Sequence, residues 1–163
     1  MNFDISLADG DCFIEATNEY LVNLLCADAP KHCSAIITHN AMDPFNPSRG
    51  LRYLPNSFSI IIDRDPRDSF VEMLPHSHVA LDVDNFIKRF KILHQQVNRH
   101  TDRSNRVIRL KYEDLVLDYD QTVRELLKFL GEPRKRHTHA SRFFNPEKAK
   151  KNTQVWKKHH NYS

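Results

Sequence analysis

Glycine is scarce in this chain of 163 residues, and its scarcity excludes the best-known phosphate-binding loops. The glycines, Gly10, Gly50 and Gly131, lie far apart in the sequence. A G-x-G-x-x-G fingerprint or a complete G-x-x-x-x-G-K loop needs glycines only a few residues apart. If this protein binds a phosphate group, it does so without the usual glycine-rich loop.

Cysteine pairs and long apolar runs are missing as well. Cys12, Cys26 and Cys33 are odd in number and form no C-x-x-C pair, so we expect reduced thiols in a cytoplasmic protein and no metal site. No apolar run approaches the ~18 residues that a membrane span needs. The first residues, MNFD, lack the basic and apolar regions of a secretory signal, so we expect no such signal.

Positive charge is concentrated near the end of the chain. Residues 134–160 contain nine Lys or Arg and one acid, Glu147, and therefore carry +8; the whole chain carries +3, so the remainder carries 3 − 8 = −5. Such a segment is either a solvated surface or a contact for an anionic partner. Specific nucleic-acid binding is the least favoured interpretation, because the acidic remainder would oppose it and no nucleic-acid-binding motif is present.

The composition, 40% hydrophobic and 28% charged, fits one globular domain over residues 1–163, with a basic C-terminal segment at 134–163. Apolar periodicity predicts strands that alternate with helices. The expected helices lie near residues 11–27, 67–74, 83–97 and 118–130, and the expected strands at 35–38, 59–63 and 107–112. This alternation predicts an α/β domain with a mainly parallel sheet.

Local signals refine these elements. The continuous apolar run at 59–63 favours a strand that is buried on both faces. Asp82 or Asp84 is expected to cap the helix at 83–97, and Asp118 is expected to form a capping box with Gln121. Gly131 is expected to end the last predicted helix.

Residues capable of chemistry follow all three predicted strands, namely His39, Arg64 and Tyr112. Ligands of parallel sheets bind beyond the carboxyl ends of the strands, so this edge is the predicted site. Arg64 can hold an anion, or Arg64, Asp65, Arg67 and Asp68 can pair among themselves in a structural ion network. His39 is either a general base or one of ten scattered histidines, and Tyr112 either contacts a base or sugar or belongs to the core.

Three segments occur in a distinctive order: IIIDRDPRD at 60–68, LKYEDL at 110–115 followed by FLGEP at 129–133, and the stretch from Phe144-Asn145-Pro146 to Trp156. This order resembles the sulfotransferases that use 3′-phosphoadenosine 5′-phosphosulfate (PAPS). Thr38-His39 matches the position of the family's catalytic histidine. The resemblance covers residues 35–158 and implies a three-layer, mainly parallel, P-loop-like sulfotransferase fold.

The resemblance also implies roles for individual residues. Arg64 would bind the nucleotide 3′-phosphate, Tyr112 would contact the adenine, and Lys151 with Asn152 would complete the phosphate site. His39 would activate the acceptor. The co-substrate would be PAPS, without a metal, and the acceptor would be an unidentified hydroxyl or amine of a small molecule, glycan or lipid.

The sequence departs from the family pattern at two places. The family carries a serine eight residues after the arginine as a second 3′-phosphate ligand, where this chain has Glu72; Ser69 is a possible substitute. The family's N-terminal 5′-phosphosulfate loop, a basic residue followed by S-G-T, is absent, and Gly10 lies between two aspartates. We therefore expect a chain that corresponds to the C-terminal two-thirds of a sulfotransferase, with an incomplete sheet.

Two functions remain open from the sequence. The favoured one is a sulfotransferase, or a fragment of one, that transfers a sulfuryl group from PAPS to a hydroxyl or amine. The alternative is a non-catalytic nucleotide-binding or interaction module derived from a sulfotransferase, which would bind adenosine 3′-phosphates without transferring sulfate.

Overall fold

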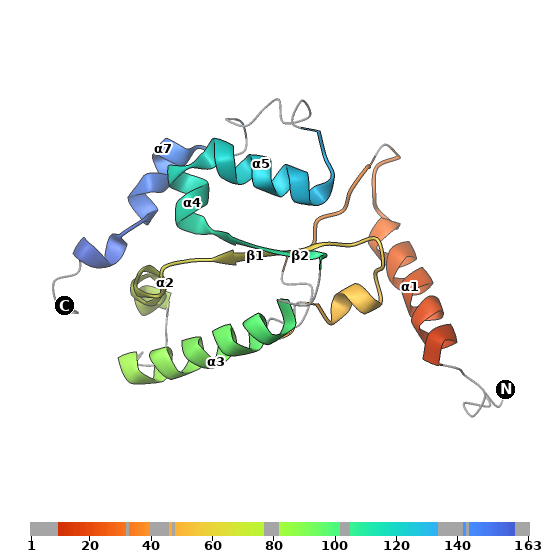
Figure 1. The fold of residues 1–163 in the computed structure, drawn as a ribbon, viewed down its shortest axis with the longest axis horizontal. Helices are drawn as coiled ribbons and strands as arrows, with labels where there is room; N and C mark the ends of the chain where they lie inside the picture. The colour runs from red at the N-terminus through yellow and green to blue at the C-terminus, as the bar shows by residue number, and fades with distance from the viewer. Residues whose placement is uncertain are drawn as a thin grey trace.

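The computed structural model of the chain describes residues 10–31, 33–39, 46, 48–76, 82–101, 105–133, 142 and 144–158. A pair of parallel strands lies between helices (Figure 1). The helices are α1 (Gly10–Cys26), α2 (Pro66–Met73), α3 (Val83–Thr101), α4 (Tyr112–Leu117), α5 (Tyr119–Leu130) and α7 (Pro146–Ala149). Short 3-10 helices occur at η2 (Gly50–Arg52), η3 (Leu74–His76), η5 (Lys150–Asn152) and η6 (Val155–Lys158).

The sheet consists, within the described residues, of β1 (Ser59–Asp63) and β2 (Val107–Lys111), paired in parallel with Ile61 opposite Arg109. Both strands were predicted, and α3 and α5 lie on opposite sides of them (Figure 1). The mixed α/β character is therefore confirmed. A three-layer, P-loop-like sheet stays a prediction, because two strands are compatible with that fold but do not define it.

The strand predicted at residues 35–38 is wrong. Residues 33–39 have no regular structure, and the side chain of Ile37 is 94% exposed. A strand needs a neighbour to take up its backbone N–H and C=O groups, and no described segment pairs with these residues. An apolar run alone could not reveal that this partner is missing.

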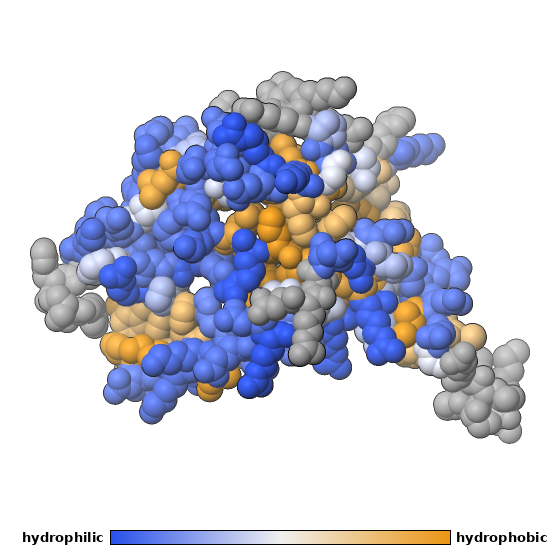
Figure 2. Space-filling model, viewed as in Figure 1, coloured by the Kyte–Doolittle hydropathy of each residue, from blue (hydrophilic) through white to orange (hydrophobic). Residues whose placement is uncertain are grey.

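The prediction that β1 is buried on both faces is also wrong. Ile60 and Ile62 are 43% and 51% exposed, respectively, whereas Leu110 on the neighbouring strand is buried. Successive side chains of a strand point to opposite faces, so Ile60 and Ile62 lie on the same face of β1, and that face is incompletely covered. In the described part of the chain, β1 also has a neighbouring strand, β2, on one edge only. Figure 2 shows hydrophobic side chains reaching the surface in the middle of the molecule.

The predicted helices are confirmed to within a few residues, and local chemistry explains most of their ends. Asp65 caps α2, and Asp82 caps α3 by accepting hydrogen bonds from the N–H groups of Asp84 and Asn85. Gly131 follows α5 in the left-handed region, at φ 70°, and so ends that helix as predicted.

The capping box predicted at Asp118 is not formed. Asp118 occupies the N-cap position of α5, but its side chain accepts no capping hydrogen bond, and Gln121 bonds to Glu125 instead. Asp118 also ends α4, where its N–H donates to the carbonyl of Asp114 at 2.8 Å. The sequence pattern did not foresee α4, and the backbone of Asp118 must serve two consecutive helices.

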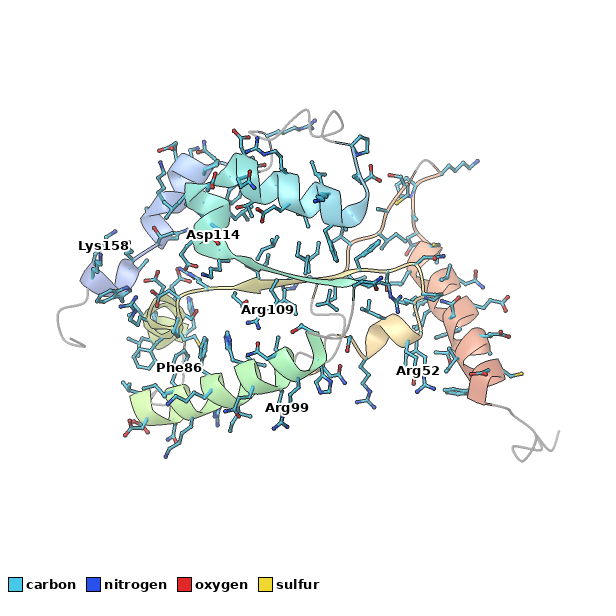
Figure 3. All side chains as sticks on the ribbon, in the orientation of Figure 1. Arg52, Phe86, Arg99, Arg109, Asp114 and Lys158 are labelled. Carbon is cyan, nitrogen blue, oxygen red and sulfur yellow. The ribbon has the colours of Figure 1, made fainter. Side chains whose placement is uncertain are left out.

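The two strands are joined to α3 by a polar cluster. The carboxylate of Asp63 accepts hydrogen bonds from Nε and Nη2 of Arg109 at 2.7 and 2.8 Å. Arg109 points from the sheet toward α3 (Figure 3), where it also bonds to Asn98. Phe70 of α2 packs edge to face against Phe86 of α3, so α2 is held close to the carboxyl end of β1.

Candidate functional site

Arg64 lies directly after β1 and brings together segments that are distant in the sequence. Its Nη2 donates to the carbonyl oxygen of Asn152 at 2.6 Å, and its Cζ lies 5.1 Å from the centroid of the Tyr112 ring. Arg64, Tyr112 and Asn152 were all predicted to bind one ligand. The structure places them together at the carboxyl end of the strands, the edge at which parallel sheets bind ligands.

The guanidinium of Arg64 is paired with Glu72 of α2. Nη2 donates to Oε1 of Glu72 at 2.7 Å, and Nη1 donates to Oε2 of the same carboxylate. The hydrogen bond from Arg64 is the main reason that the pKa of Glu72 lies below its ordinary value of 4.5. Glu72 therefore turns toward Arg64 and stays ionised at neutral pH.

The ion network that was the alternative interpretation of residues 64–68 is present in part. Arg64 pairs with Glu72, whereas Arg67 pairs with Asp65 at 2.6 Å (Nη2 to Oδ2). The Arg67 hydrogen bond lowers the pKa of Asp65 below its ordinary value of 3.8. Asp68, the last charged residue of the run at 63–68, has a different function in the structure.

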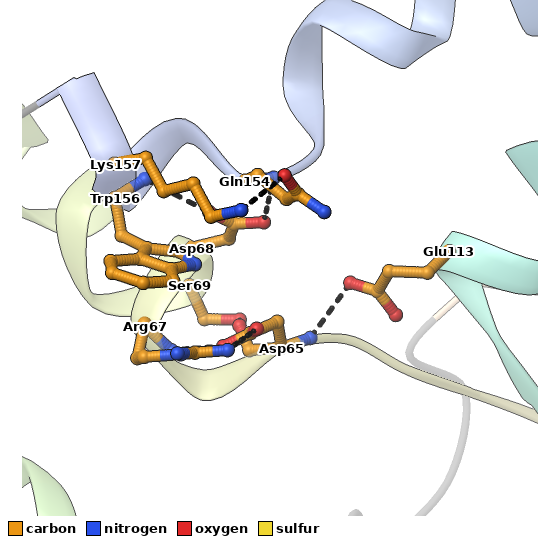
Figure 4. Close-up of polar contacts among 8 residues, drawn as sticks. All are labelled: Asp65, Arg67, Asp68, Ser69, Glu113, Gln154, Trp156 and Lys157. Carbon is orange, nitrogen blue, oxygen red and sulfur yellow. Dashed lines mark hydrogen bonds and ion pairs between the residues drawn. The ribbon is translucent and has the colours of Figure 1, made fainter.

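Asp68 anchors the basic C-terminal segment to α2 (Figure 4). Its carboxylate is 1% exposed and accepts hydrogen bonds from the backbone N–H groups of Gln154, at 2.7 Å, and Trp156, at 3.1 Å. The indole of Trp156 stacks on the guanidinium of Arg67, with Cζ 4.0 Å from the ring centroid. Sequence reasoning missed Asp68, since nothing local distinguishes it from a surface acid.

Glu113 is a second residue that sequence reasoning missed. Its Oε1 accepts a hydrogen bond from the backbone N–H of Asp65 at 2.9 Å, which ties α4 to the loop between β1 and α2 (Figure 4). Its position inside the LKYEDL segment was the only available signal. The loop that carries Arg64 is therefore held by Glu113 from one side and by Asn152 from the other.

We call the meeting point of Arg64, Tyr112 and Asn152 the Arg64 junction. The remaining predicted site residues are Lys151 and His39. Lys151 is exposed and directly precedes Asn152 in η5. His39 is exposed and belongs to the segment 33–39, which follows α1. In Figure 1 this orange segment lies toward α1, whereas α2, α4 and the C-terminal turns lie at the other end of the strands. The structure does not bring His39 to Arg64.

The Arg64 junction retains unused donor capacity. Nε of Arg64 is buried and has no hydrogen-bond partner among the described residues, and the same holds for Nε1 of Trp156. Figure 3 shows Asp114 of α4 and Lys158, the last residue of η6, at the same end of the molecule. The arrangement brings a planar cation next to an aromatic ring, a pair suited to an anionic ligand with a ring.

No group of three or more His, Cys, Asp or Glu side chains that could hold a metal ion occurs among the described residues. No helix in these residues is both long and apolar enough to cross a membrane.

Comparison with protein families identifies the family to which most of the chain corresponds. The family model described as "Sulfotransferase family" matches residues 14–136, which is most of the chain and includes most of α1, both strands and α5. The match ends before the C-terminal turns that carry Lys151 and Asn152. Neither the curated proteins nor the solved structures yielded a match.

Proposed function

Since this chain belongs to the sulfotransferase family, we propose that it binds the nucleotide of PAPS at the carboxyl ends of β1 and β2 and transfers the sulfuryl group to a hydroxyl or amine acceptor. The observation that supports this most directly is the Arg64 junction. Arg64, Tyr112 and Asn152 come from three separate segments and meet within hydrogen-bond or ring-contact distance. Each of them has a nucleotide-binding role in the family pattern.

In this proposal the guanidinium of Arg64 binds the 3′-phosphate, and Tyr112 offers its ring to the adenine. Asn152 and Lys151 complete the phosphate site from the basic C-terminal segment, which Asp68 holds against α2. This use also explains why positive charge is concentrated at residues 134–160 of a chain whose remainder is acidic.

The chemical step is an in-line transfer. The bond between sulfur and the 5′-phosphate oxygen breaks, a bond forms between sulfur and the acceptor oxygen or nitrogen, and the acceptor proton goes to a base. We assign His39 as that base, following the family pattern. Negative charge accumulates on the sulfuryl oxygens and the leaving phosphate, so positioning and cationic stabilisation supply the catalysis.

A second candidate function, nucleotide binding without transfer, is favoured by one observation. The segment that carries His39 lies toward α1 and away from α2 and α4 in Figure 1, and the sequence lacks the S-G-T loop that would hold the 5′-phosphosulfate. Under this alternative, the Arg64 junction would bind an adenosine 3′-phosphate, but the protein would transfer no sulfuryl group.

Calorimetric titration of adenosine 3′,5′-bisphosphate tests the nucleotide site. We expect binding by the wild-type chain and a loss of at least about tenfold in affinity for Arg64→Ala, because a charge-assisted bidentate contact disappears. Arg52→Ala is the matched control; Arg52 is an exposed arginine near α1 (Figure 3) and should leave the affinity unchanged. Equal affinity of Arg64→Ala and wild type would refute the assigned site.

Transfer assays with PAPS then separate the two functions. Sulfated product from hydroxyl or amine acceptors, lost in His39→Ala with nucleotide affinity kept within a few-fold, would support the enzyme. Tight nucleotide binding without product from any acceptor would support the non-catalytic module.

A further inference from the structure

We propose that Glu72 is an internal competitor for the anion site: its carboxylate occupies the guanidinium of Arg64 when no nucleotide is bound, and a nucleotide 3′-phosphate must displace it. The inference rests on the proposed function and adds to it a residue that lowers the affinity for the nucleotide. The family pattern does not include such a competitor, because it has a serine where this chain has Glu72.

The geometry of the pair is that of an occupied anion site. Both carboxylate oxygens of Glu72 face both terminal nitrogens of Arg64, one contact to each. Carboxylates and phosphates bind arginine through this same pair of parallel hydrogen bonds. The two anions cannot use the same edge of the guanidinium together, and their charges repel each other.

Charge balance leads to the same conclusion. While Glu72 is paired, Arg64 and Glu72 together contribute no net charge to the junction. Glu72 does not yield by protonation at neutral pH, because Arg64 and, to a lesser degree, His76 keep its pKa low. The nucleotide therefore meets a neutralised site unless the carboxylate moves away.

The two partners differ in how easily they can move. The side chain of Arg64 is 21% exposed and is held by the Tyr112 ring and the Asn152 carbonyl, whereas that of Glu72 is 46% exposed. Rotation of Glu72 into solvent therefore opens the site with Arg64 left in place. Glu72 also leaves Nε of Arg64 without an acceptor in the described part of the chain, so the carboxylate does not satisfy every donor of the guanidinium.

A purely structural ion pair is the competing explanation, and it predicts a different result. Removing Glu72 would then loosen Arg64 and would leave nucleotide affinity unchanged or weaker. Removing a competitor instead raises the fraction of binding-competent sites, and apparent affinity rises in proportion to that fraction.

The experiment is a calorimetric titration of adenosine 3′,5′-bisphosphate into wild type, Glu72→Ala, Glu72→Gln and Arg64→Ala. If Glu72 occupies the guanidinium about nine-tenths of the time, both Glu72 variants should bind about tenfold more tightly than wild type. Glu72→Ala adds no new phosphate ligand, so a gain in this variant reports loss of competition alone. Glu19→Ala is the matched control, since it removes the same charge from an exposed position on α1.

Two further titrations test whether the gain in affinity depends on the 3′-phosphate and on the guanidinium of Arg64. Adenosine 5′-monophosphate lacks the 3′-phosphate and should gain less than about twofold from Glu72→Ala. The double variant Arg64→Ala/Glu72→Ala should lose the gain for the bisphosphate, because the gain depends on the released guanidinium. A gain that persists in the double variant would overturn the inference.

Failure of the inference and failure of the proposed function give different patterns. Equal affinity of wild type and both Glu72 variants, with binding lost in Arg64→Ala, overturns the competitor and leaves the nucleotide site intact. Absence of binding in every variant, with each shown to be folded by circular dichroism and a cooperative melt, overturns both.

Discussion

The carboxyl end of the strands and the α1 side of the molecule are held in different ways. At the carboxyl end, side chains bond to backbone groups that lie far away in the sequence, as Asp68 does to Gln154 and Trp156 and as Arg64 does to Asn152. The α1 side also has a contact of this kind, from Asn18 of α1 to the carbonyl of Tyr53 at 2.7 Å, but it comes from a helix that buries none of its side chains, whereas Asp68 is buried. All of α1 is described, and none of its residues is buried.

The comparison shows that individual contacts specify the structure at the carboxyl end of the strands more than they do at α1. A buried carboxylate that receives two backbone N–H groups has a single acceptable arrangement, because any other leaves buried polar groups unpaired. The apolar side chains of α1, such as Leu24 at 57% exposure, are still largely in water and contribute little to such specificity. Substitutions at the two ends should therefore have very different effects on the free energy of unfolding.

The largest effect is expected for Asp68→Ala. The change removes the buried carboxylate that accepts from the backbone N–H groups of Gln154 and Trp156, and we expect a loss of about 3 kcal/mol in the free energy of unfolding. The C-terminal turns should also separate from α2. Trp156 is the only tryptophan, so its emission should shift to the red, and urea unfolding gives the stability change.

Asp28→Ala is the matched control for Asp68→Ala, because Asp28 is an exposed aspartate just after α1. We expect it to change neither the emission nor the unfolding midpoint. If Asp68→Ala behaved like this control, the two ends would not differ as the contacts indicate.

An intermediate, pH-dependent effect is expected for Asp65→Ala, which removes the N-cap of α2. Loss of the cap should cost about 1 kcal/mol at pH 7. The pKa of Asp65 is lowered in the folded state, chiefly by the hydrogen bond from Arg67. The stabilisation is therefore fully present above the ordinary pKa of 3.8 and is lost as the pH falls through the lowered value.

Urea unfolding of wild type and Asp65→Ala between pH 3 and pH 7 measures this dependence. The difference in stability should be constant at the upper end of this range and should shrink at the lower end. A difference that grew on acidification would show that the folded state does not favour the ionised carboxylate.

The smallest effect is expected for Leu24→Gln on α1. Glutamine keeps helix propensity, and the leucine side chain is already largely in water, so the unfolding free energy should change by less than about 0.5 kcal/mol. The same urea titration measures it. A loss as large as that of Asp68→Ala would mean that α1 is packed more tightly than its exposure indicates, and the comparison between the two ends would fail.

Much of the local structure could be predicted from the sequence, because its causes are local. The strands at 59–63 and 107–111, the proline-initiated α2 and the glycine end of α5 follow from residues within a few positions of each element. The predicted strand at 35–38 failed because pairing depends on a distant segment. The capping box at Asp118 failed because an adjacent helix already used that backbone.

The sequence by itself determined the two strands and the longer helices, the charge asymmetry and the family, since all of these reside in residue types and their spacing. Only the tertiary structure decided that Asp68 is buried and holds the C-terminal segment, that Glu113 supports the Arg64 loop, and that Glu72 faces Arg64. These last facts depend on which segments meet at the carboxyl end of the strands. The residue type of a charged side chain does not show whether it will face water or another protein group. Packing decides this, because it brings a second group within hydrogen-bond distance and removes the surrounding water.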